Sequence, residues 1–464
     1  MKSIAILTAV LVALECGMQP SVAEEPAAKP ASLLVVTPQR FEESLGAYLK
    51  HRRADLPVTV AILEEVLAET KGVDDPERLK KLLFDRFLHD GVRYVLLVGD
   101  ADVLPVRYMT LDRITAPAYD TAFYPSDLYY ADLAKADGSF EDWNAVRDGH
   151  HAGYFGEVRG EKNKDGPINF DAIHYVPELA VGRWPVSSSA EVERIARKTI
   201  EYETSLTAPS PGASRAGLVA VGGWVDSRPT LDRLASSLAR GGWELEKRYY
   251  ADRRNDDTPP PTESEIVSLI NGGGRLLIHA GHGTDLGWQE CLSTASIAKL
   301  RNQGQPTVMI SAGCSTARFA TLPPYEPYLD VNGVEHRGTN FGEVFKTFPP
   351  APAPYQSGRF NPPGLGEMLL RRTDAGAVAY IGCNTGSQPC GLTLLDGFGK
   401  SMEQRPAPRL GDCWVDAVTY YYERERLAQL KPTESWYPAS IYFQAMKFMV
   451  FGDPSLRLTG ASAP

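Results

Sequence analysis

Short apolar runs alternate with segments of helical spacing along most of the chain. Helical spacing predicts helices over 76–88 and 187–204, and the second opens on serines that suit an N-cap. Because the apolar runs are nearly continuous and separated by helices, they predict a parallel sheet covered by helices on both faces. In the first half, strands are expected at 33–37, 58–63, 94–100 and 178–186.

The second half repeats this pattern, and each of its apolar runs ends in glycine-rich sequence that carries polar residues. The ligand crevice of an open α/β sheet lies at the carboxyl ends of its strands, so chemistry is expected at these endings. Pro, Ser and Gly cluster at 205–214, which predicts a boundary between an N-terminal α/β subdomain, 33–210, and a C-terminal domain, 215–459. The runs lie at 217–224, 275–283, 307–314 and 376–383.

Composition narrows the class of protein. The 464 residues are 43% hydrophobic and 23% charged, which is typical of a globular protein and excludes collagen-like and low-complexity chains. The formal net charge is −10 and no long basic run offsets it, so a nucleic-acid partner is not expected.

The amino terminus predicts export. Lys2 precedes a short apolar stretch, 4–14, and a small-residue site ends at Ala23, so residues 1–23 are interpreted as a signal peptide. Cleavage near Ala23 would place the protein in the periplasm, on the cell surface or outside the cell. The competing lipoprotein reading through Cys16 has the bulky Glu15 where a small residue is expected. No later segment reaches the roughly 18–20 apolar residues of a membrane helix, and 24–32 is expected to be a flexible lead-in.

The cysteine count points to one special thiol. Removal of the signal peptide leaves five cysteines, and an odd count in an oxidising compartment implies an unpaired thiol. If Cys314 is that thiol, the glycine and proline between Cys383 and Cys390 favour a disulfide joining those two. Four buried, reduced thiols remain the alternative. The six cysteines of the whole chain are Cys16, Cys291, Cys314, Cys383, Cys390 and Cys413.

Two strand endings carry candidate catalytic groups. The run at 275–283 delivers His282 and the run at 307–314 delivers Cys314, so an imidazole and a thiol are expected side by side. A thiolate attacks a carbonyl carbon and an imidazole relays protons, as nucleophilic cysteine catalysis requires. The amides of Gly283 and Cys314 could then form an oxyanion hole. His279 is interpreted as a core histidine rather than a zinc ligand, since no further ligand cluster accompanies it.

These segments resemble the gingipain family of cysteine peptidases, peptidase family C25, in the caspase-fold clan. The resemblance rests on GHGTDLGW at 281–288 and SAGCSTARF at 311–319, and it extends in order from YVLLVGDADVLP at 94–105 through LAVGRWPV at 179–186 to FGDPSLRL at 451–458. It implies a caspase-like α/β catalytic domain preceded by a smaller related subdomain. It also implies a secreted endopeptidase that acts on protein or peptide substrates without a cofactor, with Cys314 as nucleophile and His282 as general acid and base.

The resemblance also suggests residues around this pair. Asp226, at the end of the run 217–224, is the candidate acid that orients the histidine, with Asp232 as a weaker choice and a solvated loop carboxylate as the alternative. Trp288 would either flank the cleft or pack beneath it. No acidic residue can be assigned to the floor of the pocket, so a preference for arginine or lysine is not predicted. The substrate pocket would be walled by Ala280, Ala312 and the segment 384–388, including Asn384 and Ser387.

One acidic segment is a candidate calcium site. Clustered side-chain oxygens around a glycine suit a structural calcium ion, although the spacing is not that of an EF-hand and a solvated acidic loop is the alternative. The candidate ligands are Asp127, Asp132, Asp137, Asp142, Asn144 and Asp148.

Three functions therefore compete at this stage. The preferred one is the secreted endopeptidase. The others are a noncatalytic surface protein for binding or assembly that keeps the fold, and a processing peptidase dedicated to a secretion or sorting pathway. The Cys314 and His282 pair argues against the noncatalytic protein, and the sequence leaves the oligomeric state open.

Overall fold

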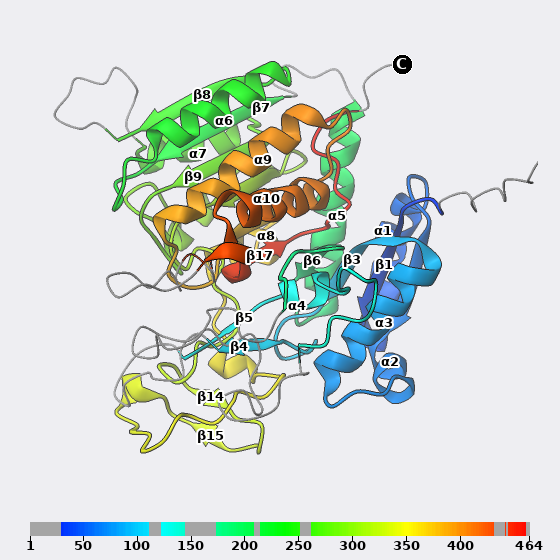
Figure 1. Ribbon diagram of the computed structural model, residues 1–464. Coiled ribbons are helices and arrows are strands. Elements are labelled where there is room, and N and C mark those ends of the chain that lie inside the picture. The colour runs from blue at the N-terminus through cyan, green and yellow to red at the C-terminus, as the bar shows by residue number, and fades with distance from the viewer. Residues whose placement is uncertain are drawn as a thin grey trace, which may run out of the picture.

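A ten-stranded sheet forms the centre of the molecule (Figure 1). The computed structural model describes residues 29–110, 122–143, 173–207, 214–250, 261–430, 441 and 444–460. The predicted signal peptide lies outside these residues, and the first strand begins at Ser32. The strand order is β2 (Val58–Ile62), β1 (Ser32–Thr37), β3 (Val92–Val98), β6 (Ala180–Trp184), β17 (Phe448–Phe451), β16 (Ala377–Cys383), β13 (Thr307–Ser311), β9 (Leu276–Ala280), β7 (Arg215–Ala220) and β8 (Glu244–Tyr249).

The sheet consists of two blocks of parallel strands that run in opposite directions. Neighbouring strands pair in parallel from β2 to β17 and from β16 to β8. The blocks meet at β16 and β17, which pair antiparallel, with Tyr380 opposite Phe451 and Cys383 opposite Phe448. The two predicted regions, 33–210 and 215–459, therefore share one sheet. The predicted fold class, a mostly parallel sheet flanked by helices, is confirmed: within this ten-stranded sheet the strands are antiparallel only at this junction.

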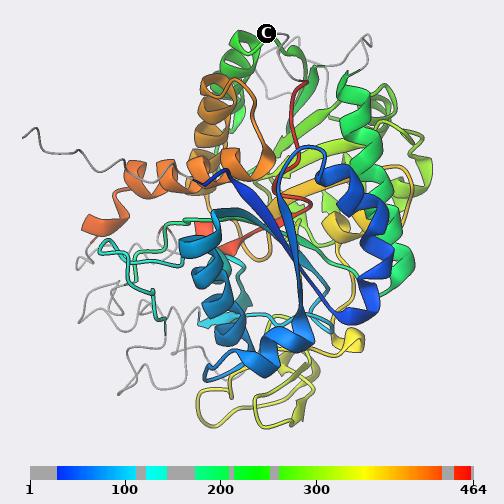
Figure 2. The ribbon, with the colours of Figure 1, turned by 90° about the vertical axis from the view of Figure 1, so that its right-hand side faces the viewer.

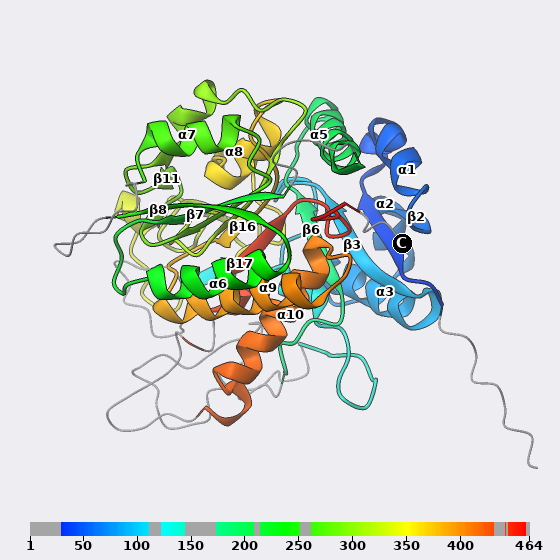
Figure 3. The ribbon, with the colours of Figure 1, turned by 90° about the horizontal axis from the view of Figure 1, so that it is seen from above.

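Helices cover both faces of the sheet, as the sequence predicts (Figure 3). α1 and α5 lie side by side on one face (Figure 2). Each face has its own buried apolar cluster, to which the covering helices contribute leucine, isoleucine, valine and aromatic side chains. One face carries α1 (Gly46–Arg52), α5 (Ser189–Thr207), α7 (Glu263–Asn271) and α8 (Leu365–Arg371). The other carries α2 (Leu63–Glu69), α3 (Asp75–Asp90), α6 (Arg228–Arg240), α9 (Leu392–Gln404) and α10 (Leu410–Arg424).

Local sequence sets the ends of these elements. In α3 the Asp74 side chain accepts a hydrogen bond from the Glu77 N–H, and Gly91 ends the helix in the left-handed region at φ 71°. No helix in the described part of the chain is both long and apolar enough to cross a membrane. The smaller elements are α4 (Leu128–Ala131), β4 (Tyr108–Thr110) with β5 (Phe123–Pro125), β10 (Gly283–Thr284) with β11 (Gly287–Trp288) and β12 (Leu292–Ser293), and β14 (Tyr328–Leu329) with β15 (Glu335–His336).

Candidate active site

The carboxyl ends of β7, β9, β13 and β16 meet at one edge of the sheet. β9 and β13 are parallel neighbours in which His279 lies opposite Ser311. His282 and Cys314 each lie three residues beyond that pair. The loops after β9 and β13 therefore leave the sheet at the same position along the strands. The strand pairing therefore places the imidazole and the thiol at one edge.

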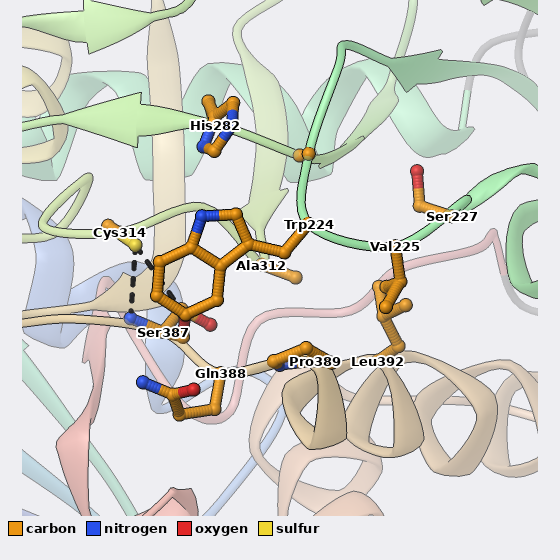
Figure 4. Close-up of a pocket in the computed structure, with 12 residues that line it drawn as sticks. Trp224, Val225, Ser227, His282, Ala312, Cys314, Ser387, Gln388, Pro389 and Leu392 are labelled. Carbon is orange, nitrogen blue, oxygen red and sulfur yellow. Dashed lines mark hydrogen bonds between the residues drawn. The ribbon is translucent and has the colours of Figure 1, made fainter.

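His282 and Cys314 line one pocket with about 430 Å³ of empty space (Figure 4). His282 is exposed and Cys314 is half-buried. Gly283 lies directly against the turn that carries the thiol. A Cβ atom at position 283 would lie 3.1 Å from the Cys314 carbonyl oxygen and 2.5 Å from Cγ2 of Thr316. The absence of a side chain at Gly283 is thus what lets the two loops approach each other.

The Cys314 sulfur is held by the loop that follows β16. The Ser387 N–H lies 3.3 Å from Sγ, and Sγ lies 3.5 Å from the Ser387 carbonyl oxygen (Figure 4). A backbone N–H aimed at sulfur stabilises a thiolate, whereas the carbonyl accepts from a neutral S–H. The loop therefore has a partner for the thiol in either protonation state.

The Gly283 and Cys314 N–H groups are the two donors predicted for the oxyanion hole. The Gln289 N–H donates to the His282 carbonyl, which makes Gly283 and Trp288 a non-hydrogen-bonded pair of the antiparallel β10–β11 hairpin. The Gly283 N–H is therefore not used across the hairpin. Within the described residues the Cys314 N–H donates to no other group.

His279 and Trp288 form the floor beneath the site. Both side chains are buried, and their rings stack at 4.5 Å. Ser311 Oγ accepts from the Gly313 N–H and the Thr316 hydroxyl, so its own hydrogen points to His279 Nδ1 at 2.8 Å. Burial lowers the pKa of His279 to about 3, and the ring is neutral. His279 is a core residue, as predicted. Trp288 is buried and does not line the Cys314 pocket, but it lines a neighbouring pocket with His282 and Gly283, so its role at the cleft stays a prediction.

Two other predicted substrate contacts are also buried. Ala280 is the last residue of β9 and Asn384 follows β16, and neither lines the pocket. Asn384 donates from Nδ2 to the Pro125 carbonyl, so it anchors its loop to the N-terminal half. Of the predicted substrate contacts, Ala312 and Ser387 line the pocket. Ala280 is thus buried where its strand ends, and Asn384 is buried although it follows its strand.

Asp226 does not approach the histidine. Its carboxylate accepts from Arg228 Nε at 2.8 Å and Nη2 at 2.9 Å, and Arg228 lowers the pKa of Asp226. Asp232 pairs with Lys247 at 2.6 Å. Among the described residues, none donates to or accepts from the His282 side chain, so the predicted orienting acid is not assembled in this structure.

The predicted Cys383–Cys390 disulfide is wrong, since the five cysteines of the described residues are all free thiols. Cys383 ends β16 with its side chain fully buried in the core, whereas Cys390 lies in the turn Pro389–Gly391 against the Tyr421 hydroxyl. Burial raises the pKa of the Cys291, Cys383 and Cys413 thiols to about 12. Burial also raises the pKa of Cys390. These four thiols are protonated at neutral pH, and Cys314 is the thiol beside a histidine.

The predicted calcium ligands separate. Asp127 pairs with Arg183 at 2.7 Å, and Asp137 accepts from the backbone and side chain of Ser139. Asn144 and Asp148 lie outside the described residues, and Asp142 is not part of the one candidate group found among those described. That group joins Asp132 to two residues missed by sequence analysis, His174 and Glu178, and its ligand atoms lie within 4.8 Å of one another. One imidazole with two carboxylates suits a transition metal better than calcium, which prefers oxygen ligands.

Most of the pocket wall consists of residues that the sequence motifs did not indicate. Trp224 and Val225 follow β7, Pro389 lies in the turn before α9, and Leu392 is the first residue of α9 (Figure 4). Trp224 could have been predicted, because it is the last residue of the glycine-rich segment that ends the predicted strand at 217–224. No motif marks Gln444, a fully buried residue that holds the loop behind Cys314.

Comparisons with known proteins identify the family. The model of peptidase family C25 matches residues 26–459. Gingipain R2 of Porphyromonas gingivalis (strain ATCC BAA-308 / W83) is 20% identical over 300 residues, which are 62% of this chain and 32% of that protein. The chain thus matches about a third of the length of this relative.

Two solved structures share the fold. The crystal structure of the Arg-specific cysteine proteinase gingipain R (RgpB) has a TM-score of 0.60 at 16% identity, over 96% of this chain and 83% of that one. The complex of Porphyromonas gingivalis RgpB pro- and mature domains has a TM-score of 0.58 at 17% identity, over 92% of this chain and 79% of that one. The family match and this caspase-like α/β architecture confirm the resemblance read from the motifs: the chain belongs to peptidase family C25, the gingipain-type cysteine peptidases.

Proposed function

We propose that the protein is an exported endopeptidase that hydrolyses peptide bonds through a Cys314 thiolate and an acyl-enzyme intermediate. The observation that carries the proposal is the single pocket shared by His282 and Cys314, with the Ser387 N–H 3.3 Å from sulfur. The other four thiols have raised pKa values, which leaves Cys314 as the nucleophile.

The proposed reaction has two halves. The thiolate attacks the carbonyl carbon, the new S–C bond forms, and the negative oxygen accepts hydrogen bonds from the Gly283 and Cys314 N–H groups. When the C–N bond breaks, protonated His282 gives its proton to the leaving amine. Water then attacks the thioester while His282 takes a proton, and the acid product leaves as the C–S bond breaks. No cofactor enters this scheme.

Peptide hydrolysis tests the proposal directly. The mature protein, Cys314→Ala and the control Cys390→Ala would be incubated with a mixed peptide library, and products would be identified by mass spectrometry. We expect cleavage by the wild type and the control and none by Cys314→Ala. Iodoacetamide at neutral pH should modify Cys314 before the four thiols of raised pKa. A folded wild type that cleaves nothing and whose Cys314 stays unmodified would support the noncatalytic binding protein.

Export and calcium are separate proposals. The predicted signal peptide places the mature amino terminus at Glu24, which sequencing of the exported protein would check.

Calcium near Asp132 is tested by thermal melting with and without a chelator. A lower melting temperature with the chelator supports a bound ion, and restoration by Zn²⁺ but not Ca²⁺ would favour the group with His174 and Glu178. An unchanged melting temperature would contradict a stabilising cation at this site.

A further inference from the structure

The pocket beside Cys314 is apolar. Its walls away from the reacting groups are formed by Trp224 and Val225 after β7, Ala312 after β13, Pro389 in the turn before α9 and Leu392 at the start of α9 (Figure 4). Apart from His282 and Cys314, the residues that line it are apolar, glycine or uncharged polar side chains. The pocket opens directly at the sulfur, so a substrate bound there places a side chain next to the attacked carbonyl.

Among the described residues, two carboxylates that neighbour the pocket in sequence have cationic partners outside it. Asp226 lies between two pocket residues in sequence, yet its oxygens accept from the Arg228 guanidinium at 2.8 and 2.9 Å and from the Arg228 N–H at 3.0 Å. Asp396, on α9 just beyond the pocket, pairs with Arg233 at 2.7 Å. A lysine or arginine side chain entering the pocket would therefore lose hydration without gaining a counter-charge from the described residues that line it.

The pocket rim exposes apolar surface that a ligand could cover. Trp224 is 70% exposed and Val225 is 45% exposed, and both stand beside the reacting pair. Exposed apolar side chains gathered at one concave site are typical of a binding surface. A substrate side chain that covers them gains binding energy in proportion to the apolar area removed from water.

We propose that this pocket binds the side chain of the substrate residue on the acyl side of the scissile bond and selects an uncharged apolar side chain over lysine or arginine. This inference rests on the proposed peptidase function and adds its substrate class. Leucine, methionine and phenylalanine are the expected favourable residues, because they match the apolar walls and leave no charge unpaired.

The test uses fluorogenic peptides that differ only at this residue, carrying Leu, Met, Phe, Arg, Lys or Asp. We expect kcat/KM for the best apolar residue to exceed that for Arg and Lys at least tenfold in the wild type. The variant Val225→Asp places a carboxylate in the pocket wall and should shift the ratio toward Arg and Lys by tenfold or more. Val73→Asp is the control. It makes the same change at an exposed valine that does not line the pocket, and it should leave the ratio unchanged.

Cleavage after Arg or Lys at an equal or greater rate in the wild type would overturn the inference and leave the peptidase intact. Peptidyl acyloxymethyl ketones carrying Leu or Lys provide a second measurement, since they alkylate an active cysteine without turnover. Faster modification of Cys314 by the Leu probe supports the inference, and faster modification by the Lys probe contradicts it. If neither peptides nor probes react with wild-type Cys314, the peptidase function itself fails and the inference falls with it.

Discussion

The loops that carry His282 and Cys314 approach each other closely at Gly283, which has no room for a side chain. A methyl group there would lie 2.5 Å from Thr316 Cγ2 and 3.1 Å from the Cys314 carbonyl oxygen. We expect Gly283→Ala to displace the Gly283 N–H and lower kcat by about 10²–10³, the usual effect of losing one oxyanion donor. Steady-state kinetics measure this. Gly46→Ala, where the new methyl group meets nothing within 4 Å, is the control, and equal kcat values for both variants would contradict the role of Gly283.

His279 makes a separate prediction about acid stability. Burial lowers its pKa to about 3, below the usual 6.5, so between these values the unfolded chain binds a proton that the folded chain does not. The free energy of unfolding should therefore fall as pH falls below about 6.5, by about 1.4 kcal/mol per pH unit from this group alone. His279→Gln removes the group, so urea unfolding from pH 7 to 4.5 should show a shallower decline. The exposed change His89→Gln should keep the wild-type slope, and parallel curves for His279→Gln and the wild type would refute the assignment.

Residues that follow a buried strand could be predicted from the sequence, whereas contacts that depend on the course of a loop or hairpin could not. Cys314 and His282 stand out because each follows an apolar strand and a small residue, and topology brings parallel strand ends together. The role of Trp288 could not be read in the same way, because its stacking on His279 depends on a hairpin that returns over the sheet. The partner of Asp226 is only two residues away, yet which side chain it meets depends on how the loop after β7 turns.

At the scale of elements, the loop after β16 is set by a residue from a distant segment. Gln444 accepts from the Gln388 N–H at 3.0 Å and donates to Ser387 Oγ at 3.1 Å. Its side chain is fully buried, so both bonds are shielded from water. Because the Ser387 N–H contacts the Cys314 sulfur, Gln444 is a positioning residue for the Cys314 thiol.

Replacing Gln444 should therefore alter the thiol more than the fold. We expect Gln444→Leu to lower kcat at least tenfold and to move the pH midpoint of Cys314 alkylation upward, because the N–H that stabilises the thiolate is no longer held in place. Gln444→Glu keeps one acceptor and should recover part of the rate. The exposed change Gln429→Leu is the control. An alkylation midpoint in Gln444→Leu equal to that of the wild type would show that the residue is only structural.

The strands and helices were predictable where hydrophobicity alone determines them. The eight predicted apolar runs are strands β1, β2, β3, β6, β7, β9, β13 and β16, which are largely buried except for the edge strand β2. β8 was missed because ELEKRY is a polar strand at the sheet edge. β17 was missed because it has only four residues. So short an apolar run does not show whether it forms a strand or in which direction that strand would run. That short strand joins the two blocks, so the topology depends on the element with the weakest signal.

At the scale of the whole molecule, a buried charge cluster joins segments that lie far apart in sequence. Arg52, at the end of α1, is fully buried and donates to both carboxylate oxygens of Glu203 on α5, at 2.9 and 3.0 Å. It also pairs with Asp453, which follows β17 and accepts from the Tyr48 hydroxyl at 2.8 Å. The cluster fixes the first helix to the strand that connects the blocks.

Arg52→Met should consequently destabilise both halves together. It leaves two buried carboxylates without their cation, and the expected loss is about 3–5 kcal/mol in the free energy of unfolding. Urea unfolding would be followed by circular dichroism and by the reaction of buried Cys291, in the C-terminal half, with a thiol reagent. Since the halves share one sheet, both midpoints should fall by the same amount. Arg86→Met, at an exposed pair with Asp90, should change stability by less than about 1 kcal/mol. If Cys291 stayed protected while helical signal was lost, the two halves would be separate folding units and the shared sheet would not make them cooperative.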